Sequence, residues 1–324
     1  MYASRLLFSP LKLCYVLVLF ISSVITCSSV LAETKAPALA ESGPTGRSAP
    51  TMLVQNKRIF ILQIVDHPAL NATRKGIEDE LKEAGFTAQY EVAQGNPSLS
   101  AQIAQKFVGK KPDILIGIGT TAAQSLSAAR RAHPIPIVFS SVTDPKLAGL
   151  VEDLSHPENN ITGVSNFLEP RKQFELLKKS LPALSKLGII YNPGEANSVS
   201  LIQKMQAQAP EFGFSLVLAT ATNTGEIAQA TQSLIHKVDA IFVNNDNTAL
   251  AAFESISKIA SQNKIPVFVS DVDLFDKGAL AAFGPNQYEI GRQTGKMAIQ
   301  ILQGAKPETL PVLFPDKIEW RKKK

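Results

Sequence analysis

Hydroxyl side chains follow two neighbouring apolar runs in the first half of this sequence. Thr120 and Thr121 come after the run at 113–117, and Ser141 and Thr143 come after the next run. Hydroxyls and free backbone N–H groups at the start of a helix bind a carboxylate well, because they are donors and the helix dipole favours negative charge there. This half of the sequence therefore predicts a carboxylate site.

The corresponding positions in the second half carry amides and acids. Asn192, Asn197 and Ser198 follow one apolar run, and Asp246 and Asp271 follow two others. Acidic and carbonyl oxygens are the acceptors that an ammonium group needs, so the two halves together offer partners for a zwitterion. A simpler alternative stays open for the two threonines and the two aspartates, because such side chains also cap helices.

The sequence lacks the residues and motifs that several kinds of catalytic and cofactor site require. Both cysteines, Cys14 and Cys27, lie in the first 32 residues, and the four histidines are far apart in the sequence. There is no Gly-x-Ser-x-Gly motif and no P-loop, and Gly117-x-Gly119 has no third glycine at the dinucleotide spacing. We therefore expect no metal, no cofactor and no enzymatic activity.

Short apolar runs alternate with amphipathic helices along the chain, an order typical of parallel α/β sheets. Strands are predicted at 58–65, 88–93, 113–117, 135–140, 187–191, 215–219, 240–243 and 265–269, with helices at 70–84, 98–108, 121–132, 198–212, 225–235 and 249–262. The order repeats after the middle of the chain. The predicted fold class is α/β, with two doubly wound parallel-sheet lobes joined by a hinge. Ligands of such sheets bind beyond the carboxyl ends of the strands, which adds His67, after the first strand, to the candidate ligand-binding residues.

The N-terminal segment has the pattern of a secretory signal. Arg5 and Lys12 precede an apolar run at 13–21, and small residues lead to Ala32, after which we expect cleavage. Residues 33–56 read as a flexible leader. The chain is thus expected in the periplasm or otherwise outside the cytoplasm. An uncleaved membrane anchor and a lipid anchor on Cys27 are the alternatives.

The net charge of +5 does not indicate nucleic-acid binding. Arg5 and Lys12 lie in the predicted signal and four more basic residues lie in the tail at 321–324, so the remaining chain is close to neutral. No basic stripe interleaved with aromatic side chains remains, and we expect no nucleic-acid partner.

Several motifs in the predicted loops resemble those of the ABC transporter substrate-binding family whose better-known members take up tryptophan and tyrosine. The resemblance covers residues 58–306. It rests on His67-Pro68-Ala69-Leu70, Ala122-Ala123-Gln124, Val142-Thr143-Asp144-Pro145, Ala148-Gly149-Leu150-Val151, Asn160-Ile161-Thr162-Gly163-Val164, Tyr191-Asn192-Pro193-Gly194-Glu195-Ala196-Asn197-Ser198, Asp246-Asn247-Thr248 and Gly291-Arg292-Gln293-Thr294-Gly295.

The resemblance implies a type I periplasmic-binding fold, in which the lobes close over a ligand. Residues 57–163 with 284–308 would form the first lobe, and 164–283 with 309–324 the second. Crossovers would lie at 163–170, 279–285 and 311–315. The family's usual terminal strand and helix would extend past Lys324, where this chain ends.

The resemblance also implies an ABC importer's permease and ATPase as partners, and a small ligand, an amino acid above all. Thr120, Thr121, Ser141 and Thr143 would hold its carboxylate, and Asp246 or Asp271 its ammonium. Aromatic walls would come from Phe167, Tyr191 or Phe283. We expect a monomer. Two alternatives remain, a ligand sensor without transport and an exported enzyme on the same scaffold.

Overall fold

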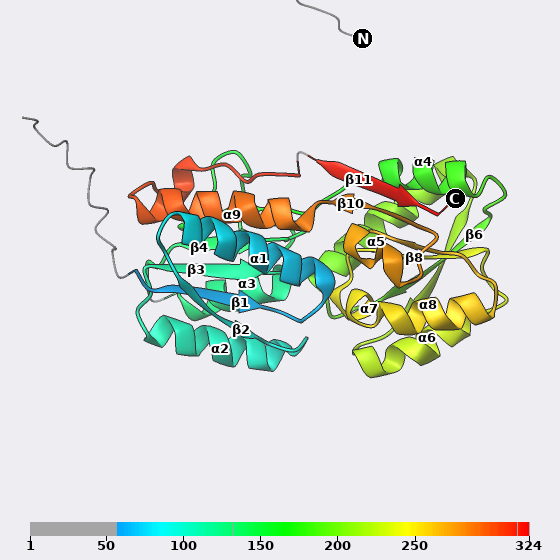
Figure 1. Cartoon of the computed structure of the whole chain (residues 1–324), viewed down its shortest axis with the longest axis horizontal. Coiled ribbons are helices and arrows are strands. Elements are labelled where there is room, and N and C mark those ends of the chain that lie inside the picture. Colours follow the sequence, from blue (N-terminus) through cyan, green and yellow to red (C-terminus); the bar gives the residue numbers. More distant parts are fainter. Residues whose placement is uncertain (1–56, 132, 316, 324) are drawn as a thin grey trace, which may run out of the picture. The chain divides into compact units, whose positions relative to one another are not determined.

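The structure is a computed structural model that describes residues 57–131, 133–315 and 317–323. The predicted signal and leader, residues 1–56, lie outside the described residues. The described chain forms two sheets, each flanked by helices, which we call the first and second lobes (Figure 1). No helix in the described part is long and apolar enough to cross a membrane.

The first lobe contains a five-stranded parallel sheet in the order β2-β1-β3-β4-β5. Its strands are buried runs of aliphatic residues because helices cover both faces, as parallel sheets require. The strands are β1 (Ile59–Gln63), β2 (Ala88–Val92), β3 (Ile114–Ile118), β4 (Ile137–Ser140) and β5 (Ile161–Val164). The helices are α1 (Pro68–Glu83), α2 (Pro97–Gly109), α3 (Thr120–Ala129) and, from late in the chain, α9 (Gln287–Leu302).

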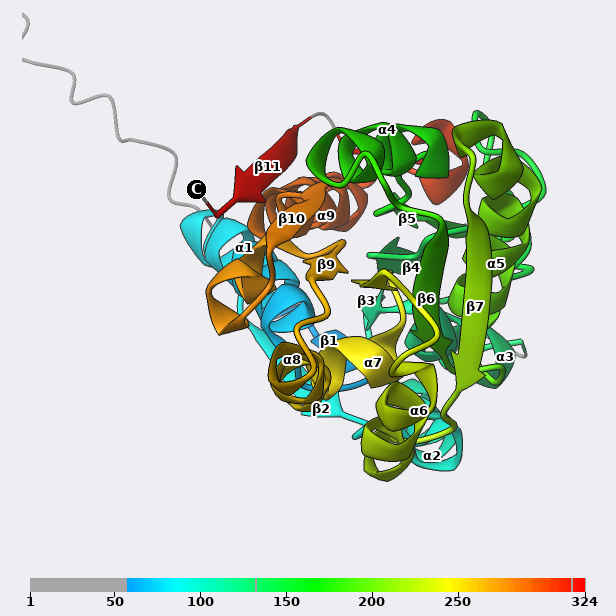
Figure 2. The same ribbon diagram turned by 90° about the vertical axis from the view of Figure 1, so that its right-hand side faces the viewer.

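The second lobe, which faces the viewer in Figure 2, contains a six-stranded sheet in the order β11-β10-β9-β8-β6-β7. Its strands are β6 (Lys186–Tyr191), β7 (Ser215–Thr220), β8 (Ala240–Val243), β9 (Val267–Val269), β10 (Ala281–Pro285) and β11 (Ile318–Lys322), of which β11 alone runs antiparallel to its neighbour in this described sheet. The helices are α4 (Pro170–Ser180), α5 (Ala196–Gln208), α6 (Ile227–Leu234), α7 (Asn247–Ala251) and α8 (Phe253–Gln262). The predicted fold class is confirmed.

Two of the predicted helices are interrupted in the structure. The helix predicted at 198–212 ends at Gln208 and continues as a 3-10 turn at Ala209–Phe212, because Pro210 cannot donate the backbone hydrogen bond that an α-helix needs. The helix predicted at 249–262 is broken at Ala252 into α7 and α8. Because α7 then begins at Asn247, the residues before it form a capped turn at the end of β8.

Segments that pass between the lobes lie side by side. The chain leaves the first lobe after β5, returns through α9 and leaves again after Leu313. The backbone N–H of Ser165 donates to the carbonyl of Leu313 at 2.8 Å, and the N–H of Leu313 donates to the carbonyl of Gly163 at 3.0 Å. Two crossover segments are therefore hydrogen-bonded to each other, which is suited to a hinge.

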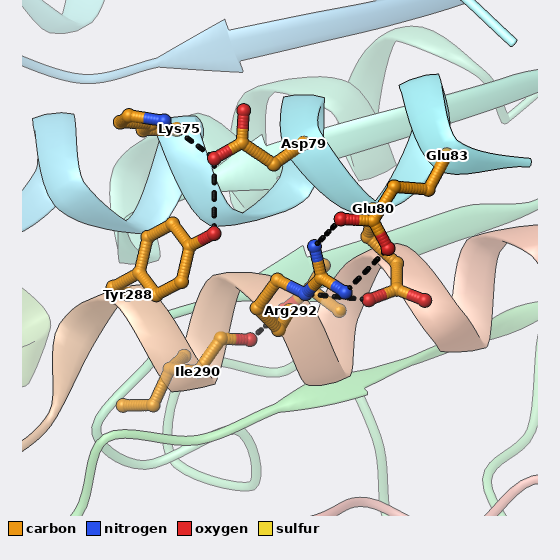
Figure 3. Close-up of polar contacts among 8 residues, drawn as sticks. Lys75, Asp79, Glu80, Glu83, Tyr288, Ile290 and Arg292 are labelled. Atoms are coloured by element: carbon orange, nitrogen blue, oxygen red, sulfur yellow. Dashed lines mark hydrogen bonds and ion pairs between the residues drawn. The ribbon is translucent and has the colours of Figure 1, made fainter.

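Helix α9 is held on α1 by close backbone contact and by charge. A Cβ on Gly76 would lie 2.2 Å from the carbonyl oxygen of Tyr288, so the two helices meet where α1 has no side chain. Arg292 on α9 pairs with Glu80 and forms a two-pronged pair with Glu83 on α1 (Figure 3). These contacts fix the start of α9, and so the position of Gln287.

Candidate functional site

A narrow cavity lies between the lobes, beyond the carboxyl ends of the strands. It leaves about 10 Å³ for the centre of a water-sized sphere, roughly the room for one water molecule. The lining is mostly polar and comes from both lobes: His67, Ala69, Leu70, Ser141, Thr143, Asn166, Asn197, Asn245, Asn247, Leu250, Asp271 and Gln287. Among the described residues, no group of acidic, cysteine or histidine side chains is arranged to hold a metal ion.

His67 joins the two lobes at this cavity. It precedes α1 and is buried, and its Nε2 lies 3.4 Å from Oδ1 of Asn247 in the second lobe. Burial lowers the pKa of His67 to about 4, against the opposing effects of Asn247 and Asp66. The imidazole is therefore neutral at pH 7. Its Nδ1 is buried and has no hydrogen-bond partner in the described chain.

Hydroxyl groups of the first lobe gather around Gln287. Ser141 donates to Oε1 of Gln287 at 3.2 Å, and Thr73 donates to the same oxygen at 3.3 Å. Ser141 adopts a left-handed backbone with φ 53°, which turns the chain at the end of β4. Thr143 donates to Oδ1 of Asn166 at 3.0 Å. The side-chain oxygens of Gln287 and Asn166 are thus occupied, which leaves their amide N–H groups as donors.

In the second lobe, the buried carboxylate of Glu195 holds the side-chain amides of Asn197 and Asn247 in place. This carboxylate accepts from Nδ2 of Asn197 at 3.2 Å and from the backbone N–H and Nδ2 of Asn247 at 2.9 and 2.7 Å. It also accepts from the backbone N–H and the hydroxyl of Thr248 at 3.0 and 2.8 Å. The amide nitrogens of Asn197 and Asn247 are therefore fixed. Oδ1 of Asn197 is buried and has no partner among the described residues.

Asp271 contributes a buried carboxylate at the end of β9. Its Oδ1 accepts the backbone N–H of Asp273 at 3.0 Å, while its Oδ2 has no hydrogen-bond partner within the described ranges. Burial raises the pKa of Asp271 to about 7, and the charge of Asp273 adds to the shift. The backbone N–H groups of Asp273 and the nearby Ala69 oppose it. Asp271 is therefore about half ionised at neutral pH.

Three buried polar atoms without partners belong to side chains that line this one cavity: Nδ1 of His67, Oδ1 of Asn197 and Oδ2 of Asp271. Each such atom costs about 1–3 kcal/mol when it stays unsatisfied. All three can only accept hydrogen bonds while Asp271 is ionised, because the one N–H of neutral His67 faces Oδ1 of Asn247. The cavity is therefore suited to a group that carries several N–H donors and a positive charge.

Five predicted site residues line the cavity and five do not. His67, Ser141, Thr143, Asn197 and Asp271 are brought together there, whereas Thr120, Thr121, Asn192, Ser198 and Asp246 are absent from its lining. Thr120 and Thr121 form the first turn of α3, where the chain turns in at Gly119 with φ 89°. Asn192 is occupied within the second lobe, where its Nδ2 donates to the Thr248 hydroxyl at 2.9 Å.

Asp246, which was predicted to face a ligand, is not in the cavity lining, and both of its carboxylate oxygens have partners within the second lobe. Its Oδ1 accepts the backbone N–H of Ala249 at 2.7 Å, and its Oδ2 accepts that of Asn192 at 2.6 Å. Both oxygens are thus used to cap α7 and to tie it to the loop after β6. Burial and the nearby Glu195 raise the pKa of Asp246 to about 7. The helix-cap alternative describes this residue.

The cavity lining contains none of the three aromatic residues named from the resemblance. Phe167 lies under the ammonium of Lys204, which is 4.6 Å from the ring centroid, and Phe283 packs edge-on against Trp320. Tyr191 is half-buried at the end of β6 and packs against the core of the second lobe.

Sequence reasoning missed several lining residues, among them Asn166, Asn245, Asn247 and Gln287. Asn245 and Asn247 flank Asp246 in one amide-rich run, so the run itself was the signal for them. Gln287 comes from the start of α9 and meets Ser141 only because α9 returns to the first lobe. No local pattern marks it.

Further contacts hold the lobes together beside the cavity. Lys204 on α5 pairs with Asp144, which follows β4, at 2.9 Å, and the Ser200 hydroxyl donates to the same carboxylate at 3.2 Å. Nδ2 of Asn245 donates to the carbonyl of Asn166 at 3.5 Å. Lys204 and Ser200 thus bring the second lobe into direct polar contact with Asp144 of the first lobe.

Comparison with known proteins identifies the family. The model for the ABC transporter substrate binding protein family matches residues 58–319. The chain belongs to this family. A tyrosine-binding protein of Clostridioides difficile (strain R20291) is 33% identical to this substrate-binding protein over 284 residues, which cover 86% of this chain and 82% of that protein. The resemblance inferred from the loop motifs is confirmed.

Two solved structures of similar proteins, one with a ligand and one without, show which conformation this substrate-binding protein resembles. An ABC domain from Streptococcus pneumonia in complex with L-Trp is 34% identical with a TM-score of 0.78, covering 81% of this chain and 91% of that chain. A ligand-free, open structure of a substrate-binding protein from Clostridium difficile is 36% identical with a TM-score of 0.61, covering 82% and 91%. Sequence identity and coverage are similar in the two comparisons, but the TM-score is higher for the complex with L-Trp. The present structure therefore resembles the ligand-bound structure more than the open one. The two-lobed type I fold is confirmed.

Proposed function

We propose that this substrate-binding protein captures a free amino acid between its lobes and delivers it to the permease and ATPase of an ABC importer. The observation that carries the proposal is the pair of unpaired buried acceptors, Oδ1 of Asn197 and Oδ2 of Asp271, on one cavity lining. An α-ammonium group has three N–H donors and a charge that matches Asp271. Amino acids are the common small solutes that regularly carry an ammonium group next to a carboxylate.

The carboxylate of the ligand belongs on the side of the first lobe. Ser141 and Thr143 supply hydroxyls there, and Gln287 and Asn166 supply amide N–H groups whose oxygens are already occupied. Neutral His67 donates from Nε2 to Oδ1 of Asn247, so its Nδ1 is an acceptor and suits the ammonium of the ligand, not its carboxylate. A zwitterion would thus bridge the lobes and stabilise the closed state, which is how a ligand favours one conformation over another.

The comparisons support an amino acid as the ligand class. One relative is a tyrosine-binding protein, and one structural neighbour holds L-Trp. The greater likeness to that complex than to an open, ligand-free relative supports closure of the lobes as the binding motion. Which side chain is accepted depends on how the lining around Leu70 and Leu250 opens.

Calorimetry with the twenty amino acids tests the proposal. At least one is expected to bind with a dissociation constant of about 1 μM or below, equivalent to about −8 kcal/mol. Native mass spectrometry should show one ligand for each monomer, released unchanged, because the protein binds without turnover. The proposal fails if no amino acid binds, or if a bound one is converted to another compound.

Two isosteric variants separate the roles of the buried aspartates. Asp271→Asn should weaken amino-acid binding by roughly ten- to a hundredfold, because the ammonium loses its buried counter-charge. Asp246→Asn should lower the melting temperature, because it disturbs a cap and a loop contact, and change affinity little. The reverse pattern would move the ammonium site to Asp246.

Secretion is part of the same proposal. The protein would act outside the cytoplasm, with its mature N-terminus at Glu33 after cleavage behind Ala32. N-terminal sequencing of the exported protein tests this. An intact N-terminus recovered with the membrane fraction would point to an anchor.

A further inference from the structure

A second, larger cavity of about 660 Å³ opens on the first lobe. Its lining comes from the end of α3, from the segments that lead into β4 and β5, and from Glu308. β4 and β5 are parallel, and the loops that line the ligand cavity follow their carboxyl ends. The second cavity therefore lies at the amino ends of these strands, the opposite edge of the sheet.

Arg130 is the unusual residue in this cavity. It ends α3 and is only 8% exposed, and its Nη2 donates to the carbonyl of Asn159. Its Nε is buried without a partner, and within the described ranges no carboxylate lies within ion-pairing distance of the guanidinium. Burial lowers the pKa of Arg130. Buried charges in proteins are normally paired, so this guanidinium lacks the anion that its burial calls for.

The charged side chains that line this cavity, Arg130, Arg131 and Glu308, sum to one positive charge. Arg131 is exposed on the same cavity and adds a second guanidinium. Glu308 is the opposing charge, but its Oε1 accepts the backbone N–H of Asn160 at 3.1 Å and so holds the loop before β5. Ser127 and Asn160 also line the cavity; the Ser127 hydroxyl is a further polar group there, whereas Nδ2 of Asn160 already donates to the carbonyl of Pro134 at 2.8 Å.

We propose that this cavity is a second binding site, for a small oxyanion held by the guanidinium of Arg130. The planar fork of an arginine matches the oxygen pairs of phosphate and carboxylate groups. The site is separate from the cavity between the lobes in position, since the two lie at opposite edges of the sheet of the first lobe. It extends the proposed function and does not depend on it.

Anion titrations at constant ionic strength test the site. Inorganic phosphate and acetate serve as the two probes, with chloride as the reference, and binding is followed by chemical shifts of the amides near Arg130. Saturable binding of phosphate or of acetate, at least tenfold tighter than chloride, is expected, and the tighter probe identifies the anion class. Binding of both no tighter than chloride overturns the proposal.

Matched variants assign the binding to this cavity. Arg130→Gln should weaken anion binding at least tenfold, Arg131→Gln less than about threefold, and Glu308→Gln should strengthen it several-fold because the opposing charge is removed. Unchanged binding in Arg130→Gln overturns the proposal. Amino-acid binding between the lobes is the control for an intact fold in each variant.

A second substitution covers the case in which Arg130→Gln does not fold. Ser127→Glu places a carboxylate in the cavity beside Arg130, where it can pair with the guanidinium. Anion binding should be lost in this variant while the melting temperature holds or rises. A Ser127→Glu protein that binds phosphate or acetate as wild type does contradicts the site, whereas Ser127→Gln should retain binding.

Discussion

The carboxylate of Glu195 accepts both the backbone N–H and the side-chain amide of Asn247, at 2.9 and 2.7 Å. The same carboxylate accepts from Nδ2 of Asn197 at 3.2 Å, so one buried acid positions two residues that line the cavity between the lobes. Fixing both amide nitrogens decides which way the side-chain oxygens face. That orientation leaves Oδ1 of Asn247 beside His67 and Oδ1 of Asn197 unpaired.

Glu195→Gln should therefore weaken amino-acid binding even though Glu195 does not line the cavity. A glutamine keeps the size, but its NH₂ group would face N–H donors of Asn197, Asn247 or Thr248, and the buried amides would reorient. We expect an affinity loss of about tenfold and a destabilisation of about 1–3 kcal/mol. Calorimetry and urea unfolding measure the two quantities. Glu289→Gln, on the surface of α9, is the control, and equal affinity in both variants would contradict the positioning role.

Amino-acid affinity should depend on pH through Asp271. Its pKa of about 7 in the free protein means that the protonated form dominates below neutrality, and a ligand ammonium requires the ionised form. Binding then releases a proton, so affinity should be full above about pH 8. It should fall by up to about tenfold for each pH unit below 7. Calorimetry across pH 5–8.5 shows the slope, and Asp271→Asn should flatten it. A flat wild-type profile would place the ammonium elsewhere.

The alternation of strands and helices could be predicted from the sequence because each apolar run must be buried between helices. The paired halves and the loops beyond the strand ends followed from the same pattern. The direction in which a loop side chain points could not be predicted. Asp246 and Asp271 both follow buried strands, yet one carboxylate is consumed by two backbone N–H groups and the other retains an unpaired oxygen.

The family resemblance implied that residues 284–308 return to the first lobe, but local patterns could not predict which contacts this return makes. Gln287 and Ser141 are 146 residues apart, and their contact depends on how α9 packs against α1. The antiparallel pairing of β11 with β10 was likewise not predicted. Such pairings are set by the tertiary fold and leave no periodic signal in the sequence.

The contact of Lys204 with Asp144 should favour the closed state. Lys204→Met keeps most of the aliphatic side chain next to Phe167 but removes the ammonium group. In the wild type, Nζ of Lys204 lies 2.9 Å from Oδ2 of Asp144 in the other lobe. Partly exposed pairs contribute about 0.2–1 kcal/mol, so affinity should fall by up to about fivefold. The wild-type affinity should also be more salt-sensitive than that of the variant. Lys172→Met, at an exposed position on α4, should leave affinity unchanged. A matching loss there would show that the effect is not specific to the pair.

Close packing of α9 on α1 should be intolerant of a single added methyl group. In Gly76→Ala the new Cβ would lie 2.2 Å from the backbone oxygen of Tyr288 and 2.9 Å from the backbone nitrogen of Arg292. Backbone atoms cannot move aside as a flexible side chain does, so the helices must separate. We expect a destabilisation of about 3 kcal/mol or more, above the range of ordinary overpacking.

Gly109→Ala is the matched control for this substitution. Gly109 is the last residue of α2, and nothing lies within 4 Å of the position its Cβ would take. Alanine favours a helix over glycine by about 0.5–1 kcal/mol, so this variant should be neutral or slightly more stable. Urea unfolding of both proteins measures the difference. If Gly76→Ala unfolds at the same urea concentration as Gly109→Ala, α1 and α9 are not in backbone contact at Gly76, and the position of Gln287 must be held by other means.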